Sequence, residues 1–316
     1  MSAEPTTSVE DPTPGAFDVR DFARTAVGSH RSTIDLEAFE TTPLDDGTVR
    51  VLAYLRELER QTMTYLRNVL VTPTHKDARV TAFLTTWAYE KFWIADAFEV
   101  IVRAHGVDPT EPQKLSTLRA LGLEIAERAT PIVESFRANA IGPDVIGVHL
   151  ATVAVDEWII DAAYGRLATL DPHPQLVALL ERVTEVKARH RVFVEAETLR
   201  RLRDSARARS LARRSLRRTA WPIGAASTER SETAFFYESL IDGPAAQLVD
   251  DRVRALPGLA PLHLVQTART AALRGGGGSA LGTRLGRALA SAKNTIAPGA
   301  RASSTTRSDT KDGTHG

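Results

Sequence analysis

The sequence predicts an all-α protein whose main part is an antiparallel four-helix bundle. Apolar residues recur at helical spacing over four long stretches, runs that alternate between apolar and polar residues are missing, and only 6% of the residues are aromatic. Two of the three connections are short, whereas about 112–140 forms a long link with a short helix of its own. This order predicts two helix pairs joined by one long crossover.

Capping residues and prolines set the expected ends of the four helices. The first begins near Asp46, a residue type that caps helices, and the second begins near Thr74, with Asp77 three positions later in a capping box. Gly106 ends the second helix, and the third and fourth follow prolines. The expected limits are about 46–71, 74–105, 144–170 and 174–204.

Four regions are expected along the chain. Residues 1–45, rich in Thr, Pro, Asp and Glu, are predicted to be a disordered or extended segment that precedes the bundle at 46–204. Residues 205–276 are predicted to be a C-terminal helical extension, which includes the stretch SETAFFYESL. Glycines mark its end, and 277–316 is predicted to be a flexible basic tail.

Charge and composition exclude several classes of protein. Lys and Arg total 40 against 39 Asp and Glu, so the net charge of +1 gives no overall field that favours nucleic acid or anionic lipid. A chain without cysteine has no disulfide, thiolate metal site or cysteine nucleophile. The sequence lacks a Gly-rich phosphate loop, a Gly-x-Ser-x-Gly elbow and a His-Glu-x-x-His motif. It also lacks an apolar leader or a run of about 18 apolar residues, so we expect a cytoplasmic protein.

The strongest local charge is the arginine-rich run RRLRDSARARSLARRSLRR at 200–218. Such a run can contact phosphate, acidic lipid or a nucleic-acid backbone. Nucleic acid is not favoured here, because the run has neither interleaved aromatic residues nor a recognition motif. We interpret it as a solvated helix face that continues the fourth helix, with contact to an acidic surface as the alternative.

Each of the four apolar stripes contains an ionisable residue near its middle. These residues form the ion-pair quartet, namely Glu59, Lys91, Glu157 and Lys187. Charge in a core is strongly unfavourable unless it is paired or bound to metal. Two glutamates and two lysines sum to zero, so we expect one or two buried ion pairs, with Glu59 and Glu157 within contact of Lys91 and Lys187. His190 lies on the same stripe as Lys187, whereas His149 lies about 12 Å along its helix from Glu157 and is expected to be a core histidine.

Several segments resemble actinobacterial ferritin-like proteins. The stretch FLTTWAYEKFWIADAFEVIVRAHG at 83–106 resembles a metal-binding helix of that group, which carries Trp, Tyr-Glu-Glu and His and ends in His-Gly. EVKARHRVF at 185–193 is similar to their Glu-Ala-Arg-His segment, and ELERQTMTYLRNVL and LPGLAPL also resemble stretches of the group. The similarity spans about 49–262. It implies the ferritin-like di-iron carboxylate fold, in which two helices each supply a Glu and two others each supply a Glu-x-x-His pair.

The chain departs from that pattern at the metal ligands. Lys91 and Ile94 stand where the resemblance implies Glu-x-x-His on the second helix, and Lys187 replaces the Glu that precedes His190 on the fourth. Only Glu59, Glu157 and His190 remain as residual metal ligands. Glu90 and Glu185 are expected to lie off the inward face, because each step along a helix turns it by about 100°.

These departures predict a degenerate metal site. We expect a pseudoenzyme, a non-catalytic binding or scaffold protein whose partner is an unidentified protein or a second copy of the chain. The alternative is an oxidoreductase or oxygenase-like enzyme of the di-iron carboxylate type, with a single metal or a metal-free redox site near Tyr89 or Tyr164. No cofactor is expected under the first hypothesis, and one iron or manganese ion on Glu59, Glu157 and His190 under the second.

Overall fold

A computed structural model describes residues 17–108 and 142–275 of the chain. All regular elements in these two ranges are helical, so the all-α prediction is confirmed there. The helices are α1 (Val19–Arg24), α2 (Glu37–Thr41), α3 (Asp46–Leu70), α4 (Ala78–Ala104), α6 (Asp144–Leu170), α7 (Pro174–Asp204), α8 (Ala206–Leu216), α9 (Arg230–Ser239), α10 (Gly243–Ala255) and α11 (Leu264–Gly275), with 3-10 turns η1 (Arg31–Thr33), η2 (Pro73–Lys76) and η3 (Ala225–Ser227).

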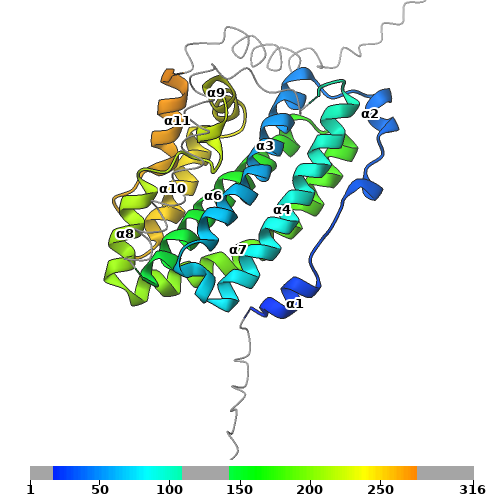
Figure 1. Cartoon of the computed structure of the whole chain (residues 1–316). Coiled ribbons are helices and arrows are strands. Elements are labelled where there is room, and N and C mark those ends of the chain that lie inside the picture. The colour runs from blue at the N-terminus through cyan, green and yellow to red at the C-terminus, as the bar shows by residue number, and fades with distance from the viewer. Residues whose placement is uncertain (1–16, 109–141, 276–316) are drawn as a thin grey trace, which may run out of the picture. The chain divides into compact units, whose positions relative to one another are not determined.

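The four long helices α3, α4, α6 and α7 lie side by side (Figure 1). α3 packs along α4 and α6 along α7, and each pair is antiparallel because only a short turn joins its two helices. The expected crossover with its own helix, at about 112–140, lies outside the described residues, as does the expected tail at 277–316. None of the described helices is long and apolar enough to cross a membrane.

The capping residues place the helix starts slightly differently from the prediction. Asp45, not Asp46, caps α3, because its carboxylate accepts a hydrogen bond from the Thr48 amide. The second long helix begins at Ala78 and not near Thr74, since the Asp77 carboxylate accepts from the Val80 amide and residues 73–76 form a separate 3-10 turn. Gly106 ends this helix with a positive φ of 74°, a backbone conformation that glycine adopts without strain.

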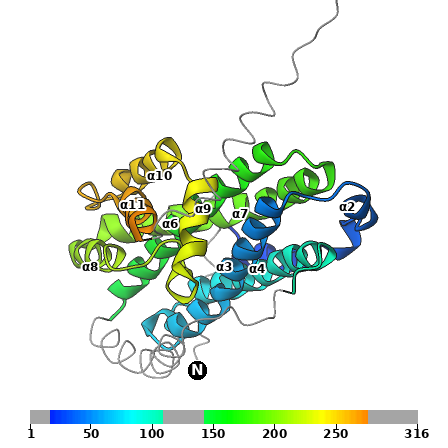
Figure 2. The ribbon, with the colours of Figure 1, turned by 90° about the horizontal axis from the view of Figure 1, so that it is seen from above.

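The N-terminal strap, residues 17–45, corrects the prediction of a disordered or extended segment. It contains α1 and α2, and it runs along the outside of α4 and α7 (Figures 1 and 2). Phe22 and Phe39 are buried, and the Phe39 ring stacks on His173 at 4.5 Å between centroids. These isolated aromatic anchors hold the strap although its sequence has no long apolar period.

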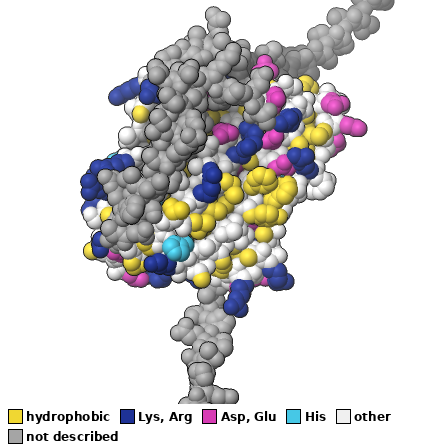
Figure 3. Space-filling view, viewed as in Figure 1, with side chains coloured by type: hydrophobic (Ala, Val, Ile, Leu, Met, Phe, Trp, Pro, Cys, Tyr) yellow, Lys and Arg dark blue, Asp and Glu magenta, His cyan; other side chains and the backbone are white. Residues whose placement is uncertain are grey.

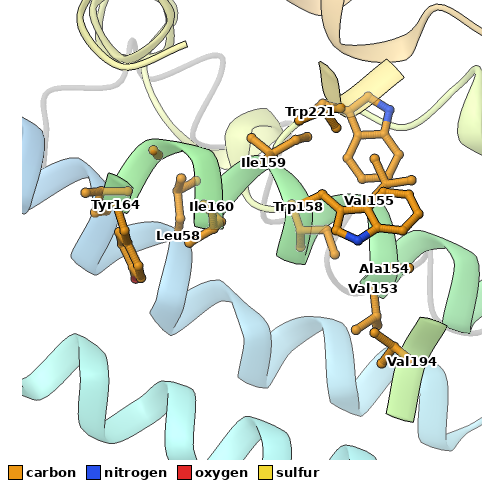
Figure 4. Packing of buried hydrophobic residues seen from close by; sticks show 14 of the residues in the cluster. Leu58, Val153, Ala154, Val155, Trp158, Ile159, Ile160, Tyr164, Val194 and Trp221 are labelled. Carbon is orange, nitrogen blue, oxygen red and sulfur yellow. The ribbon is translucent and has the colours of Figure 1, made fainter. Parts of the chain in front are cut away.

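The C-terminal extension, residues 205–275, packs on α6 through α8 and α10 (Figure 2). Figure 4 shows Trp221 beside Val155 and Trp158 on one side of α6, while the Tyr164 ring of the same helix points to the other side, where its hydroxyl bonds to Glu59 of α3. α6 is therefore covered on opposite faces. Its sequence, apolar nearly all the way round, agrees with burial between two layers of helices.

The arginine-rich run does not form one continuous helix with α7. Ser205 separates α7 from α8, and its hydroxyl caps α8 by accepting from the Ala208 amide at 3.0 Å. Arg201 pairs with Asp77 and Glu197, whereas the Arg209 guanidinium donates to the Leu202 carbonyl at 2.8 Å. The run is therefore divided between two helices, and part of its charge is neutralised within the fold.

Candidate functional site

The candidate site lies between the four long helices, each of which contributes one member of the ion-pair quartet. Glu59 comes from the middle of α3, Lys91 from α4, Glu157 from α6 and Lys187 from α7. All four side chains are at most 1% exposed. The inward stripes of the helices place them there, since apolar neighbours above and below bury the same faces.

Each lysine of the quartet contacts both glutamates. The Lys91 Nζ lies 3.1 Å from a Glu59 carboxylate oxygen and 3.6 Å from Glu157. The Lys187 Nζ lies 3.2 Å from Glu59 and 3.2 Å from Glu157. Opposite charges therefore alternate around a closed ring, which is the favourable arrangement for four charges held away from water.

Two aromatic donors complete the ring. The Tyr164 hydroxyl donates to Glu59 Oε1 at 2.5 Å, and the Trp87 indole donates to Glu157 Oε1 at 2.9 Å. Burial, together with the nearby Glu59 carboxylate, raises the pKa of Tyr164 well above its usual value. Tyr164 therefore stays a neutral phenol that holds Glu59 in place.

The ionised forms of the quartet are stabilised together. Burial alone would raise the pKa of Glu59 and of Glu157, but Lys187 and Lys91 outweigh it and hold both pKa values below the usual range. Burial would lower the pKa of Lys91, yet the carboxylates of Glu59, Asp156 and Glu157 raise it instead. Glu59, Glu157 and Lys91 thus keep their charges because of the opposite charges around them.

Asp156 is a fifth charged member that helical spacing did not indicate. The Lys91 Nζ lies 3.2 Å from its Oδ2, and its Oδ1 accepts from the Ile223 amide of the C-terminal extension at 2.8 Å. Three carboxylates then face two ammonium groups. Burial raises the pKa of Asp156 despite the neighbouring Lys91, so this carboxyl is the one that most readily takes up a proton to relieve the excess negative charge.

Glu90, which was expected to lie off the inward face of α4, is nevertheless buried. Its Oε2 accepts from His190 Nε2 at 2.7 Å, and Arg189 pairs with it. The Val27 amide of the strap donates to its Oε1 at 2.8 Å. The strap covers this side of α4, which explains the burial. Glu185, in contrast, is exposed as expected.

His190 stands beside the quartet, between Glu157 and Glu90. Its Nδ1 is 3.7 Å from Glu157 Oε2, and its Nε2 is bonded to Glu90. Within 17–108 and 142–275, no group of three or more His, Cys, Asp or Glu side chains is arranged to hold a metal ion. The two lysine ammonium groups contact the carboxylates that a di-iron centre would need, so the donor set does not fit such a centre.

His149 is separate from this site. Its Nδ1 shares a hydrogen bond of 2.8 Å with the Thr74 hydroxyl, and its backbone carbonyl accepts from Tyr65 at 3.1 Å. Burial lowers the pKa of His149 to about 4 from 6.5. The ring is therefore neutral in the folded protein at neutral pH.

The lowered pKa of His149 predicts a loss of stability in acid. Above pH 6.5 the His149 ring is neutral in the folded and in the unfolded protein. Between pH 6.5 and about pH 4, the unfolded chain binds a proton at this ring that the folded chain does not bind. The free energy of unfolding should fall by up to roughly 3 kcal/mol across this window. Urea unfolding between pH 7.5 and 4 measures the effect. The His149→Asn variant should lose this component; an unchanged pH profile in the variant would contradict the assignment.

Comparison with protein-family models, curated proteins and solved structures finds no match to this chain. The site is consequently interpreted from its own geometry.

Proposed function

We propose that this chain is a ferritin-like four-helix bundle protein in which a buried ion-pair network stands in place of a di-iron centre, and that it is a non-catalytic binding or scaffold protein. The observation that carries the proposal is the position of the two lysines. Lys91 and Lys187 each contact both Glu59 and Glu157 at 3.1 to 3.6 Å. Two ammonium groups thereby balance the charge of two glutamates, as two divalent ions balance four carboxylates in a di-iron protein.

The arrangement of the long helices supports the fold part of this proposal. α3 with α4 and α6 with α7 form two antiparallel pairs, and the connection between α4 and α6 is the only long one of the three. Ferritin-like bundles have this order, with one long crossover between two helix pairs. One ionisable side chain from each helix then meets at the centre, as the resemblance implies.

The enclosure of the quartet supports the non-catalytic part. Four cavities of about 580–810 Å³ open on the described part of the molecule, and none of these four is lined by a member of the quartet, by Asp156 or by His190. An enzyme site needs room for a substrate next to the reacting groups. The quartet instead fills its space with paired charges and aromatic side chains.

One contact favours an alternative, an oxidoreductase with a metal-free redox site in the bundle core. The Tyr164 hydroxyl donates to Glu59 at 2.5 Å, so oxidation of the phenol would have a proton acceptor in place. The other form of this alternative, a single iron or manganese ion on Glu59, Glu157 and His190, is opposed by Lys187, whose ammonium group contacts both glutamates.

Metal content tests the proposal. Protein expressed with iron, manganese and zinc supplied should contain no stoichiometric metal by mass spectrometry. A variant with Lys91→Glu, Ile94→His and Lys187→Glu should bind about two ions per chain, and added Mn²⁺ should raise its melting temperature. Ile94 is suited to the change because its buried side chain lies on the same face of α4 as Lys91.

A surface variant with the same charge change, Arg60→Glu with Lys76→Glu, is the matched control, since both side chains are exposed. It should bind no metal. Stoichiometric metal in the natural protein would overturn the proposal, and one ion per chain would support the single-metal oxidoreductase.

A further inference from the structure

A cavity of about 780 Å³ opens in the C-terminal extension, away from the ion-pair quartet. It lies between the end of α8, the segment that follows α8, α9 and most of the length of α11, and α9 and α11 pack against each other. Its volume lies within the range of about 300–1,000 Å³ typical of small-molecule sites. Nothing in the proposed function uses this cavity.

The walls of the cavity are mostly apolar. Trp221, Leu262 and Leu264 provide large side chains, and α11 contributes the alanines Ala268, Ala271 and Ala272 at helical spacing. The small alanine side chains leave the space open along α11. The cavity therefore offers a hydrophobic surface long enough for an alkyl chain or an aromatic ring system.

Three basic side chains line the same cavity, namely Arg217, Arg230 and His263. All three are exposed, and no Asp or Glu is among the described residues that line the cavity. No ion pair or side-chain hydrogen bond joins any of the three to another described residue. Some other arginines of the described residues do have acidic partners, such as Arg201 with Asp77 and Arg254 with Asp251.

We propose that this cavity binds a monomeric organic acid, in which one carboxylate is joined to an aliphatic or aromatic body. The carboxylate would lie at Arg217 and Arg230, because guanidinium groups bind carboxylates with two parallel hydrogen bonds. The body would lie against Trp221 and the alanines of α11. This ligand class matches both an apolar wall and basic groups that have no acidic partner.

The wall of the cavity is connected to the buried charges. Trp221 lies two residues before Ile223, whose amide donates to Asp156, and Asp156 contacts Lys91. The Trp221 indole donates to the Leu216 carbonyl at 3.2 Å, which ties the segment to the end of α8. A ligand against Trp221 therefore changes the environment of that indole, and tryptophan fluorescence provides a readout of binding.

Calorimetric titration of the full chain with decanoate, tetradecanoate and 2-naphthoate tests the proposal, each below its micellar concentration. At least one acid should bind at micromolar concentration, and decan-1-ol should bind at least tenfold more weakly than decanoate. Replacement of both guanidinium groups, Arg217→Gln with Arg230→Gln, should weaken binding by about tenfold to a hundredfold, as expected for charge-assisted hydrogen bonds. Ala271→Phe should weaken binding by filling the cavity.

The matched control is Arg203→Gln with Arg214→Gln, two exposed arginines of α7 and α8 outside the cavity. It should bind the acids within twofold of the natural protein. Trp221→Phe should remove the fluorescence change and leave calorimetric binding measurable. The proposal is overturned if none of the acids binds below millimolar concentration, or if the Arg217 and Arg230 variant binds them as well as the control does. It is also overturned if that variant loses only binding to anionic phosphatidylglycerol vesicles, since the arginines would then serve a membrane surface.

Discussion

Replacement of Lys187 by Met should destabilise the protein by about 3–5 kcal/mol. The change removes the ammonium group that contacts Glu59 and Glu157 and leaves excess negative charge in a site closed to water. Methionine fills a similar volume, so the loss reports charge and not a cavity. Denaturant unfolding at pH 7 measures the difference.

Two further variants distinguish the loss of a buried charge from the loss of any basic side chain. Arg60→Met removes a basic side chain that is about half exposed in its pair with Glu99, and it should change stability by at most about 1 kcal/mol. Addition of Glu59→Gln to Lys187→Met should recover part of the loss, because one uncompensated carboxylate disappears. If Lys187→Met had no larger effect than Arg60→Met, the quartet would not be an interdependent ionic core.

Glu90→Gln should destabilise the protein by about 3 kcal/mol and loosen the N-terminal strap. The carboxylate of Glu90 accepts hydrogen bonds from Val27 of the strap, from Arg189 and from His190. Glutamine keeps the size but loses the charge and one acceptor oxygen. Faster hydrogen exchange in peptides from 17–45, measured by mass spectrometry, should accompany the loss of stability.

The control for Glu90 is a second ion pair between α4 and the strap. Asp96→Asn breaks the pair with Arg31, whose side chain is 58% exposed, and should change stability by no more than about 1 kcal/mol. If hydrogen exchange in peptides from 17–45 were equally fast in Glu90→Gln and Asp96→Asn, surface pairs, and not the buried carboxylate of Glu90, would hold the strap on α4.

The buried charges connect three parts of the fold. Glu90 links the bundle core to the strap through the Val27 amide, and Asp156 links it to the C-terminal extension through the Ile223 amide. Both carboxylates lie one residue before a member of the quartet, next to Lys91 and Glu157 respectively. Because one residue step turns a helix by about 100°, each of these carboxylates also reaches a segment outside the four long helices.

Local sequence was sufficient for much of the helical framework. The expected ends of the third and fourth long helices agree with α6 and α7, since Pro143 and Pro174 mark their starts and Asp171 follows the end of α6. The predicted start of α4 near Thr74 was wrong, although Thr74 and Asp77 are both residue types that cap helices. Only the fold decides between them, where the Asp77 carboxylate bonds to the Val80 amide and pairs with Arg201 of α7.

Sequence by itself determined the long helices and which ionisable residues share their inward faces. The quartet could be placed together for two reasons. Helical spacing can be read from local sequence, and an unpaired buried charge is so unfavourable that each charge must find a partner of opposite sign. Tertiary structure alone decided what covers the remaining faces. The strap buries Glu90 and the extension buries Asp156. The spacing of residues in α4 and α6 does not predict these two contacts, because each joins residues that are far apart in the chain.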